Sequence, residues 1–177
     1  METITWKNAD LSGLVWELEA NGNVYGKLKF FGGVGFGANF STGKKQFQFK
    51  KIGFWGKKIL ITKNGSYVGD IISNPLGHTY VKLDSGKTFK VTSNLLGKNL
   101  RCIDLKGKSV VHYKVATLTS MRKGQIEIAD SLTHDEKEIL LSIGLIAAHF
   151  KTWIIISYFL LFSTMLLAIS KLIEHIN

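Results

Sequence analysis

Apolar and polar residues alternate in short runs along residues 1–130, which is the pattern of half-buried β-strands. A new run begins about every ten residues, and this spacing is typical of a β-barrel or a β-sandwich. The alternation predicts strands at residues 3–7, 14–19, 24–31, 46–51, 58–63, 67–73, 79–83, 88–92, 99–104, 110–115 and 125–129.

Tight turns containing glycine separate many of these runs. Asn21-Gly22 and Asn64-Gly65 favour two-residue hairpin turns, because both central positions of such a turn need a positive φ. Ser85-Gly86 and Lys106-Gly107 are weaker forms of the same signal. The strands are therefore expected to follow one another as consecutive hairpins.

An apolar segment follows the strands at residues 139–150, where only Ser142 and His149 are polar. Thr133 and Glu136 precede it at the spacing of a capping box, which predicts the start of a helix. This helix is too short to cross a bilayer, so we expect it to be buried. The predicted fold class is mainly β: a closed antiparallel β-barrel of consecutive hairpins around a hydrophobic helix at about residues 134–150.

A second apolar segment, residues 152–170, carries no charge and is long enough to cross a bilayer as a helix. Lys151 and Lys171 flank it, and Trp153 and Tyr158 lie within it; indole rings favour the membrane interface. Residues 151–171 are therefore predicted to be a transmembrane anchor, followed by a short tail at residues 172–177. The alternative is a buried helix of a soluble domain.

Charge and the N-terminal sequence predict how the domain at residues 1–150 is placed. The first residues are polar and include acids, without the apolar run of a secretory signal. Lysines outnumber acids in residues 1–133, and lysine-rich flanks stay on the cytoplasmic side. The sequence therefore predicts a tail-anchored, single-pass membrane protein with a cytoplasmic N-terminal domain.

The chain is basic, with a formal net charge of +10, and residues 20–69 contain nine lysines and no acid. Lysines near an anionic bilayer attract its head groups, and neighbouring aromatic rings can enter the interface. The alternative is an ordinary solvated basic face with the rings in the core. The residues predicted to bind lipid are Lys44, Lys45, Lys50, Lys51, Phe54, Trp55, Lys57 and Lys58.

Several other site types find no support in the sequence. Arg101 and Arg122 are the only arginines, which argues against a nucleic-acid partner, because base readout favours arginine. The glycine-rich run at residues 31–37 does not complete a phosphate-binding motif, and a flexible loop or barrel corner is expected there. No two histidines have metal-ligand spacing, and the single cysteine, Cys102, is expected to be a core residue. No catalytic residue, metal or cofactor is predicted.

A barrel of hairpins that ends in a capped, hydrophobic helix resembles the tubby C-terminal, LURP-one-related and phospholipid scramblase superfamily. The resemblance covers about residues 1–150. It is carried by Trp16-Glu-Leu with the following Asn-Gly-Asn-Val-Tyr-Gly-Lys-Leu, and by the closing Asp135-Glu-Lys-Glu-Ile-Leu-Leu-Ser-Ile-Gly-Leu. It implies that the late helix threads the barrel, and that the protein binds phospholipid or is tethered to membranes. A scramblase-like cysteine cluster and an acidic calcium loop are both missing from this sequence.

The function expected from the sequence is that of a non-enzymatic, membrane-tethered module. It would bind anionic phospholipid head groups or present a surface to a protein partner. One alternative is a small single-pass subunit of a larger membrane complex, or a homo-oligomer, assembled through the last helix. Another is a scramblase-like lipid transporter.

Overall fold

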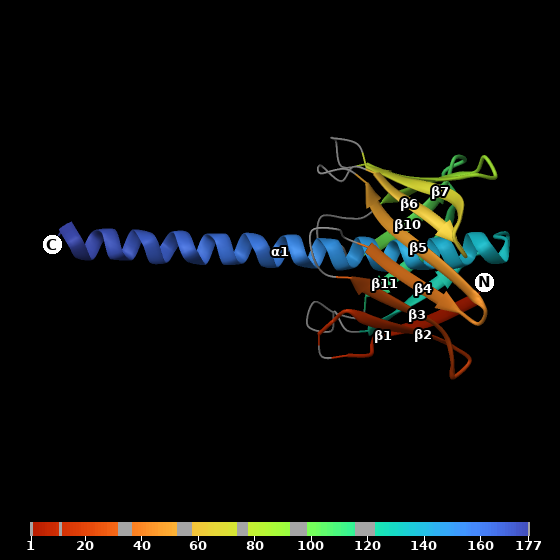
Figure 1. Cartoon of the computed structure of the whole chain (residues 1–177), viewed down its shortest axis with the longest axis horizontal. Helices are drawn as coiled ribbons and strands as arrows, with labels where there is room; N and C mark the ends of the chain where they lie inside the picture. Colours follow the sequence, from red (N-terminus) through yellow and green to blue (C-terminus); the bar gives the residue numbers. More distant parts are fainter. Residues whose placement is uncertain are drawn as a thin grey trace. The chain divides into compact units, whose positions relative to one another are not determined.

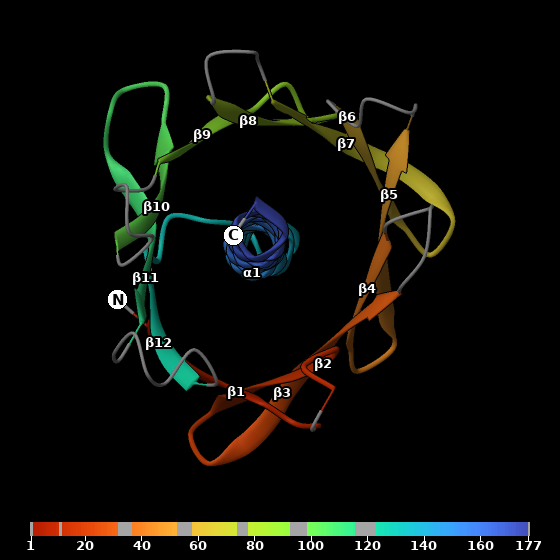
Figure 2. The same ribbon diagram turned by 90° about the vertical axis from the view of Figure 1, so that its left-hand side faces the viewer.

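The structure is a computed structural model that describes residues 2–10, 12–31, 37–52, 58–73, 78–92, 99–115 and 123–176. Its strands form an antiparallel sheet in which each strand pairs with its neighbours in the sequence, and β1 pairs with β12 to close a barrel (Figures 1 and 2). The strands are β1 (Glu2–Asn8), β2 (Val15–Ala20), β3 (Asn23–Phe31), β4 (Gly37–Thr42), β5 (Lys45–Ile52), β6 (Lys58–Lys63), β7 (Ser66–Ser73), β8 (Thr79–Leu83), β9 (Thr88–Thr92), β10 (Asn99–Asp104), β11 (Ser109–Val115) and β12 (Lys123–Ile128). One helix, α1 (His134–Ile176), follows them.

The predicted barrel is confirmed, with one strand more than the sequence indicated. That strand is β4, where Gly37, Asn39 and Ser41 supply small or polar residues in place of a clear alternation with bulky ones. Gly37, predicted to belong to a loop or barrel corner, is the first residue of β4, and Phe31 is the last residue of β3. The rest of that predicted loop, residues 32–36, lies outside the described residues.

The hairpin turns at residues 21–22 and 64–65 are confirmed by their backbone angles. Asn21 and Gly22 have φ values of 52° and 77°, and Asn64 and Gly65 have values of 48° and 87°. The two weaker signals form a different turn. At residues 84–86 the Gly86 amide donates to the Leu83 carbonyl at 3.0 Å, and only Gly86 has a positive φ, so this connection has three residues. Residues 105–107 repeat this geometry.

The interior of the barrel is filled by alternate strand residues and by the first part of α1. Phe40, Phe47 and Phe49 are fully buried, as are Leu140 and Ile143 of the helix. Figure 2 shows the ring of strands around the first part of α1. The buried helix is the predicted one: the Thr133 amide donates to Glu136 Oε2 at 3.0 Å and the Glu136 amide donates to Thr133 Oγ1 at 3.4 Å, so the capping box is confirmed.

Cys102 also lies in the core, as expected. Its side chain is fully buried, and this burial raises the pKa of the thiol to about 12. The thiol therefore stays protonated at neutral pH and is a packing group rather than a nucleophile.

The chain divides into two compact units, Met1–Gly144 and Leu145–Asn177, and α1 contributes to both. Among the helical residues whose side chains are described, no stretch is both long and apolar enough to cross a membrane. The predicted anchor falls partly outside that set: the side chains of residues 151–160, including Lys151, Trp153 and Tyr158, are not described.

Candidate functional site

The two ends of the barrel differ in their connections. At one end, here called the turn end, the strands are joined by the tight turns at residues 21–22, 43–44, 64–65, 84–86 and 105–107, and α1 begins (Figure 1). At the other end, here called the loop end, lie the last residues of the alternate strands, Phe31, Ile52, Ser73, Thr92 and Val115. Each end thus collects residues that are far apart in the sequence.

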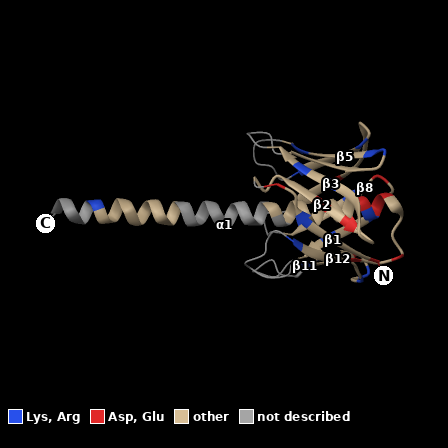
Figure 3. Ribbon diagram, turned by 90° about the horizontal axis from the view of Figure 1, so that it is seen from below, with Lys and Arg blue, Asp and Glu red and all other residues tan. Residues whose placement is uncertain are grey.

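Most carboxylates of the barrel gather at the turn end. They are Glu2, Glu19, Asp84, Asp104, Glu127, Asp130, Asp135, Glu136 and Glu138. In Figure 3 the acidic positions cluster where α1 begins. Among the described residues of the loop end, the carboxylates are Asp10, Glu17 opposite Lys7, and Asp70 beside Lys58, whereas the strand positions there carry Lys7, Lys51, Lys58, Lys114 and Lys123. The loop end is therefore the positively charged end of the barrel.

Exposed apolar side chains lie beside these lysines on one part of the loop end. Phe31 is 39% exposed and Ile52 is 42% exposed. Gly37 lies opposite both Phe31 and Lys50 in the sheet, and Ile52 lies opposite Lys58. We call the set Phe31, Lys50, Lys51, Ile52 and Lys58 the basic rim. Its mixture of cations and exposed apolar groups is typical of a surface that meets a membrane interface.

The predicted lipid-binding residues are split between the two ends. Lys50, Lys51 and Lys58 lie on the basic rim, where Lys58 forms an ion pair with Asp70 at 3.0 Å. Lys44 is exposed in the turn that precedes β5, at the turn end. The lipid roles of Phe54, Trp55 and Lys57 stay predictions, because these residues lie outside the described ones. The pairs Lys44-Lys45 and Lys50-Lys51, which were predicted to form one lipid-binding cluster, therefore lie at opposite ends of β5.

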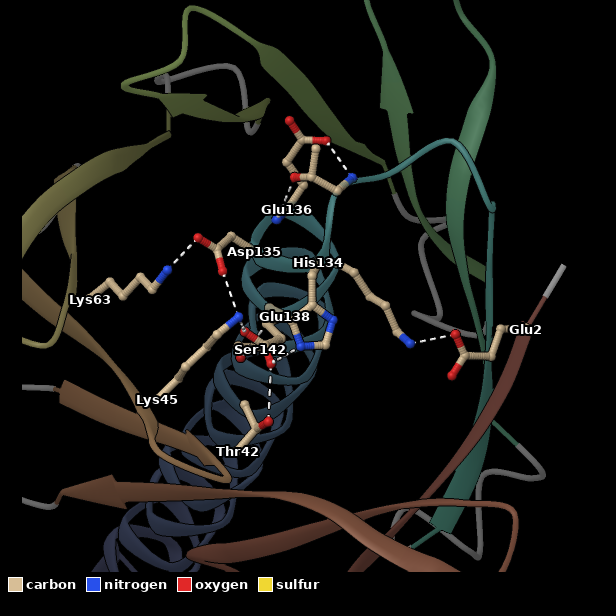
Figure 4. A network of polar contacts seen from close by, with 11 residues as sticks. Glu2, Thr42, Lys45, Lys63, His134, Asp135, Glu136, Glu138 and Ser142 are labelled. Carbon is tan, nitrogen blue, oxygen red and sulfur yellow. Dashed lines mark hydrogen bonds and ion pairs between the residues drawn. The ribbon is translucent and has the colours of Figure 1, made fainter.

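Lys45 lies beside carboxylates of α1. Its ammonium group is 2.9 Å from Asp135 Oδ1 and 3.5 Å from Glu138 Oε2 (Figure 4). Lys63 reaches the other oxygen of Asp135 at 2.5 Å. Hydrogen bonds from Lys63 and Lys45 hold the pKa of Asp135 below its usual value. Lys45 therefore binds the helix in this structure, and its predicted lipid role would have to compete with these ion pairs.

Glu138 is the most deeply buried charged group of this network. Its side chain is 0% exposed, and its Oε1 accepts a hydrogen bond from Thr42 Oγ1 at 3.0 Å. His134 Nε2 lies 3.1 Å from the same oxygen (Figure 4). A carboxylate without water around it needs such partners, since an unpaired buried charge is strongly destabilising.

The neighbouring residues of α1 reach other strands. Glu136 pairs with Lys87, just before β9, at 2.7 Å. Lys137 pairs with Glu2 of β1 and also lies over the ring of Tyr25, 4.8 Å from its centroid. We call the contacts of residues 135–138 with the barrel the polar clamp. It ties one turn of α1 to strands on several sides of the barrel and so determines where the helix enters.

The sequence reasoning missed the polar clamp, although part of its signal is visible. Glu138 is a charged residue at the start of an otherwise apolar segment, which is expensive unless a partner is present. The identity of that partner is not visible in the sequence, because Thr42 and Lys45 lie more than ninety residues earlier.

The second unit carries a separate candidate surface. Six large apolar side chains of α1 are each more than half exposed: Leu161, Phe162, Met165, Leu166, Leu167 and Ile169. Lys171, predicted to flank the anchor, is exposed and follows them. This stretch is the described part of the predicted anchor.

Comparisons with known proteins give no indication of what this protein does. The chain matches no family model, no curated protein and no solved structure. Within the described residues, no cluster of histidine, cysteine and acidic side chains has a geometry that could hold a metal ion. The features on which a function can be argued are therefore the basic rim, the polar clamp and the exposed apolar stretch of α1.

Proposed function

We propose that this protein is a non-enzymatic β-barrel module attached to a membrane through residues 152–170, and that the loop end of its barrel contacts anionic phospholipid head groups. The observation that carries the proposal is the run of exposed apolar side chains from Leu161 to Ile169. The basic rim supports the second part. The barrel with an internal helix is also the arrangement expected from the resemblance to the tubby and LURP-one-related superfamily, and membership of it is part of the proposal.

A bilayer is the occupant that best explains the exposed apolar stretch. With about 3.6 residues per turn, Leu161, Phe162 and Leu167 point to different sides of the helix. A single partner helix would cover one side, whereas lipid surrounds a helix completely. Large apolar side chains left in water would also promote aggregation. The uncharged residues 152–160 extend the same stretch toward the length of a membrane span.

Lysines at the centre of the anchor should abolish stable membrane attachment. A lysine at the middle of an inserted helix costs about 2.5–3.5 kcal/mol on insertion scales. We expect the native full-length chain to stay with membranes after alkaline carbonate extraction, and the double variant Leu161→Lys, Phe162→Lys to be released. The matched control is Leu105→Lys, because Leu105 is 78% exposed in a turn of the barrel. Release of the native chain, or retention of the double variant, would contradict the anchor.

The basic rim should contribute electrostatic attraction to anionic lipid. A lysine near an anionic surface contributes roughly 1 kcal/mol, and salt screens this attraction. Two lysines together are therefore worth about 2 kcal/mol, which corresponds to a change in affinity of about thirtyfold. Neither Lys50 nor Lys51 has an ion-pair partner among the described residues, so both are available to bind.

This contact can be measured on a chain that ends at Lys151 and keeps the whole first unit. We expect the double variant Lys50→Gln, Lys51→Gln to bind phosphatidylserine vesicles about thirtyfold more weakly at low salt. Lys106→Gln, Lys108→Gln removes the same charge from a turn at the turn end and is the control. If the two double variants lost the same amount of affinity for the vesicles, net charge alone would explain the binding. The basic rim would then have no specific role.

A further inference from the structure

The sequence contains two Asn-Gly pairs, and the fold places both of them in hairpin turns of the same kind. Asn21-Gly22 joins β2 to β3, and Asn64-Gly65 joins β6 to β7. The asparagines have φ values of 52° and 48°, and all four turn residues are exposed. In each hairpin the residues on either side of the pair lie opposite each other, so the loop has two residues. The two pairs therefore have nearly the same backbone conformation and exposure.

The two asparagine side chains are held differently. Asn64 Oδ1 accepts a hydrogen bond from the Gln46 amide at 2.9 Å, and the Asn64 amide donates to the Gln46 carbonyl at 2.8 Å. These bonds tie the turn at 64–65 to β5. The Asn21 side chain makes no hydrogen bond with the described residues, and only its backbone carbonyl accepts one, from Asn23 Nδ2 at 3.4 Å. The carboxamide group of Asn21 is therefore less constrained than that of Asn64.

An asparagine that precedes glycine is chemically labile, because no side chain hinders the approach of the glycine nitrogen to the carboxamide. This nitrogen loses its proton to water and attacks Cγ of the asparagine, which forms a C–N bond and closes a succinimide ring. The Cγ–Nδ2 bond breaks, and Nδ2 takes up a proton and leaves as ammonia. Water then adds to either ring carbonyl and gives aspartate or isoaspartate. The reaction consumes water, releases ammonia and changes no oxidation state.

Ring closure requires the side chain to rotate until Cγ meets the glycine nitrogen. For Asn64 this rotation breaks the hydrogen bond from the Gln46 amide, whereas for Asn21 no side-chain hydrogen bond has to break. We propose that Asn21 is a site of spontaneous deamidation in the folded protein, and that the hydrogen bond from Gln46 protects Asn64. A hydrogen bond worth about 1 kcal/mol corresponds to a difference in rate of about fivefold.

The modification would change the turn end of the barrel. Aspartate at position 21 adds a carboxylate to the end that already holds most of them, and it tolerates a positive φ as asparagine does. Isoaspartate also adds a methylene group to the main chain within a two-residue turn. We therefore expect it to disturb the pairing of β2 with β3 next to the turn.

The test follows both asparagines in the same molecules by peptide mapping with mass spectrometry, which detects the mass gain of an amide-to-acid change. One sample of the full-length chain is incubated folded, in neutral detergent at mildly alkaline pH. A second sample is incubated at the same pH while unfolded in guanidinium chloride. In the unfolded sample we expect similar rates at the two sites, because both asparagines precede glycine. In the folded sample we expect Asn21 to convert about fivefold faster than Asn64.

The variant Asn21→Asp identifies the products, because its peptide marks where the aspartate form elutes and leaves isoaspartate as the other product of the same mass. In this variant the rate at Asn64 should be unchanged. Equal rates at the two sites of the folded protein, or faster conversion of Asn64, overturn the proposal. Conversion of Asn21 in the unfolded sample alone also overturns it, since the hairpin itself would then protect the asparagine.

Discussion

Replacing Lys45 with methionine is expected to destabilise the protein by about 2–4 kcal/mol, because it leaves Glu138 buried without its cation. The Glu138 side chain is 0% exposed, and Lys45 is the lysine that approaches its Oε2. Thr42 and His134 would remain beside Oε1, but His134 adds a positive charge only when it is protonated. The midpoint of urea unfolding of the full-length chain in mild detergent, followed by tryptophan fluorescence, measures the change.

Lys63→Met is the matched control for this prediction. It removes the same kind of charge from the same network, but the partner of Lys63 is Asp135, whose side chain is 44% exposed. Asp135 would also keep Lys45 at 2.9 Å. Ion pairs of exposed groups are worth about 1 kcal/mol or less, so the loss should be correspondingly small. Equal losses in the two variants would mean that burial of Glu138 does not decide the energetics of the polar clamp.

A second substitution separates a charge effect from lost packing. In the Lys45→Met background, Glu138→Gln replaces the buried carboxylate with a neutral amide of similar shape. The amide needs no counter-charge, so part of the lost stability should return. If Glu138→Gln gave no recovery, the loss in Lys45→Met would have to come from the packing of its aliphatic stem.

Replacing Gly144 with alanine is expected to destabilise the protein by about 2 kcal/mol. The Cβ atom of alanine would overlap the ring of Tyr113, which is buried and whose hydroxyl donates to the Leu140 carbonyl. Overpacking of this kind typically costs 1–3 kcal/mol, and here it has to exceed the gain of about 1 kcal/mol from the better helix propensity of alanine. The same urea unfolding experiment measures this loss of stability. Gly144→Val should destabilise the protein more than Gly144→Ala does.

Tyr113→Leu provides the compensating change, because leucine has no atoms where the far side of the tyrosine ring lies. Tyr113→Leu will itself be destabilising, so the result to look for is non-additivity in a double-mutant cycle. We expect the double variant to be more stable than the sum of the two changes predicts, by about 1–3 kcal/mol. Gly22→Ala serves as the control in the same cycle. Gly22 has a φ of 77° but open space around its Cβ position, so its replacement does not collide with Tyr113 and its effect should add to that of Tyr113→Leu. Simple additivity of Gly144→Ala with Tyr113→Leu would show that the two residues do not collide.

Gly144 and Tyr113 also illustrate why the contacts inside the barrel could be predicted only in part. The sequence shows a glycine inside an apolar helical segment and a tyrosine on an alternating strand. Neither pattern indicates that the two residues meet, because the contact joins the helix to β11 inside the barrel. The strand pattern and the capping box, by contrast, involve residues within a few positions of each other, and apart from β4 both were predicted correctly.

The lysines show the same division between local and distant information. Their abundance and the absence of acids in residues 20–69 are properties of the sequence, and they predict a basic surface. The direction of β5 then places Lys44 and Lys45 at the turn end, and Lys50 and Lys51 on the basic rim. A charge count along the chain cannot show this separation, because it depends on which end of the barrel each strand reaches.

The sequence by itself determined eleven of the twelve described strands, two of the hairpin turns, the capped helix and the uncharged apolar segment at residues 152–170. These features follow from periodicity, turn chemistry and hydrophobicity over short distances. Only the tertiary structure decided that β4 completes the wall, that Lys45 belongs to the polar clamp, and that Lys7 faces Lys123 across the closure. Those contacts join residues far apart in the chain, and the closing of the sheet around the helix sets their register.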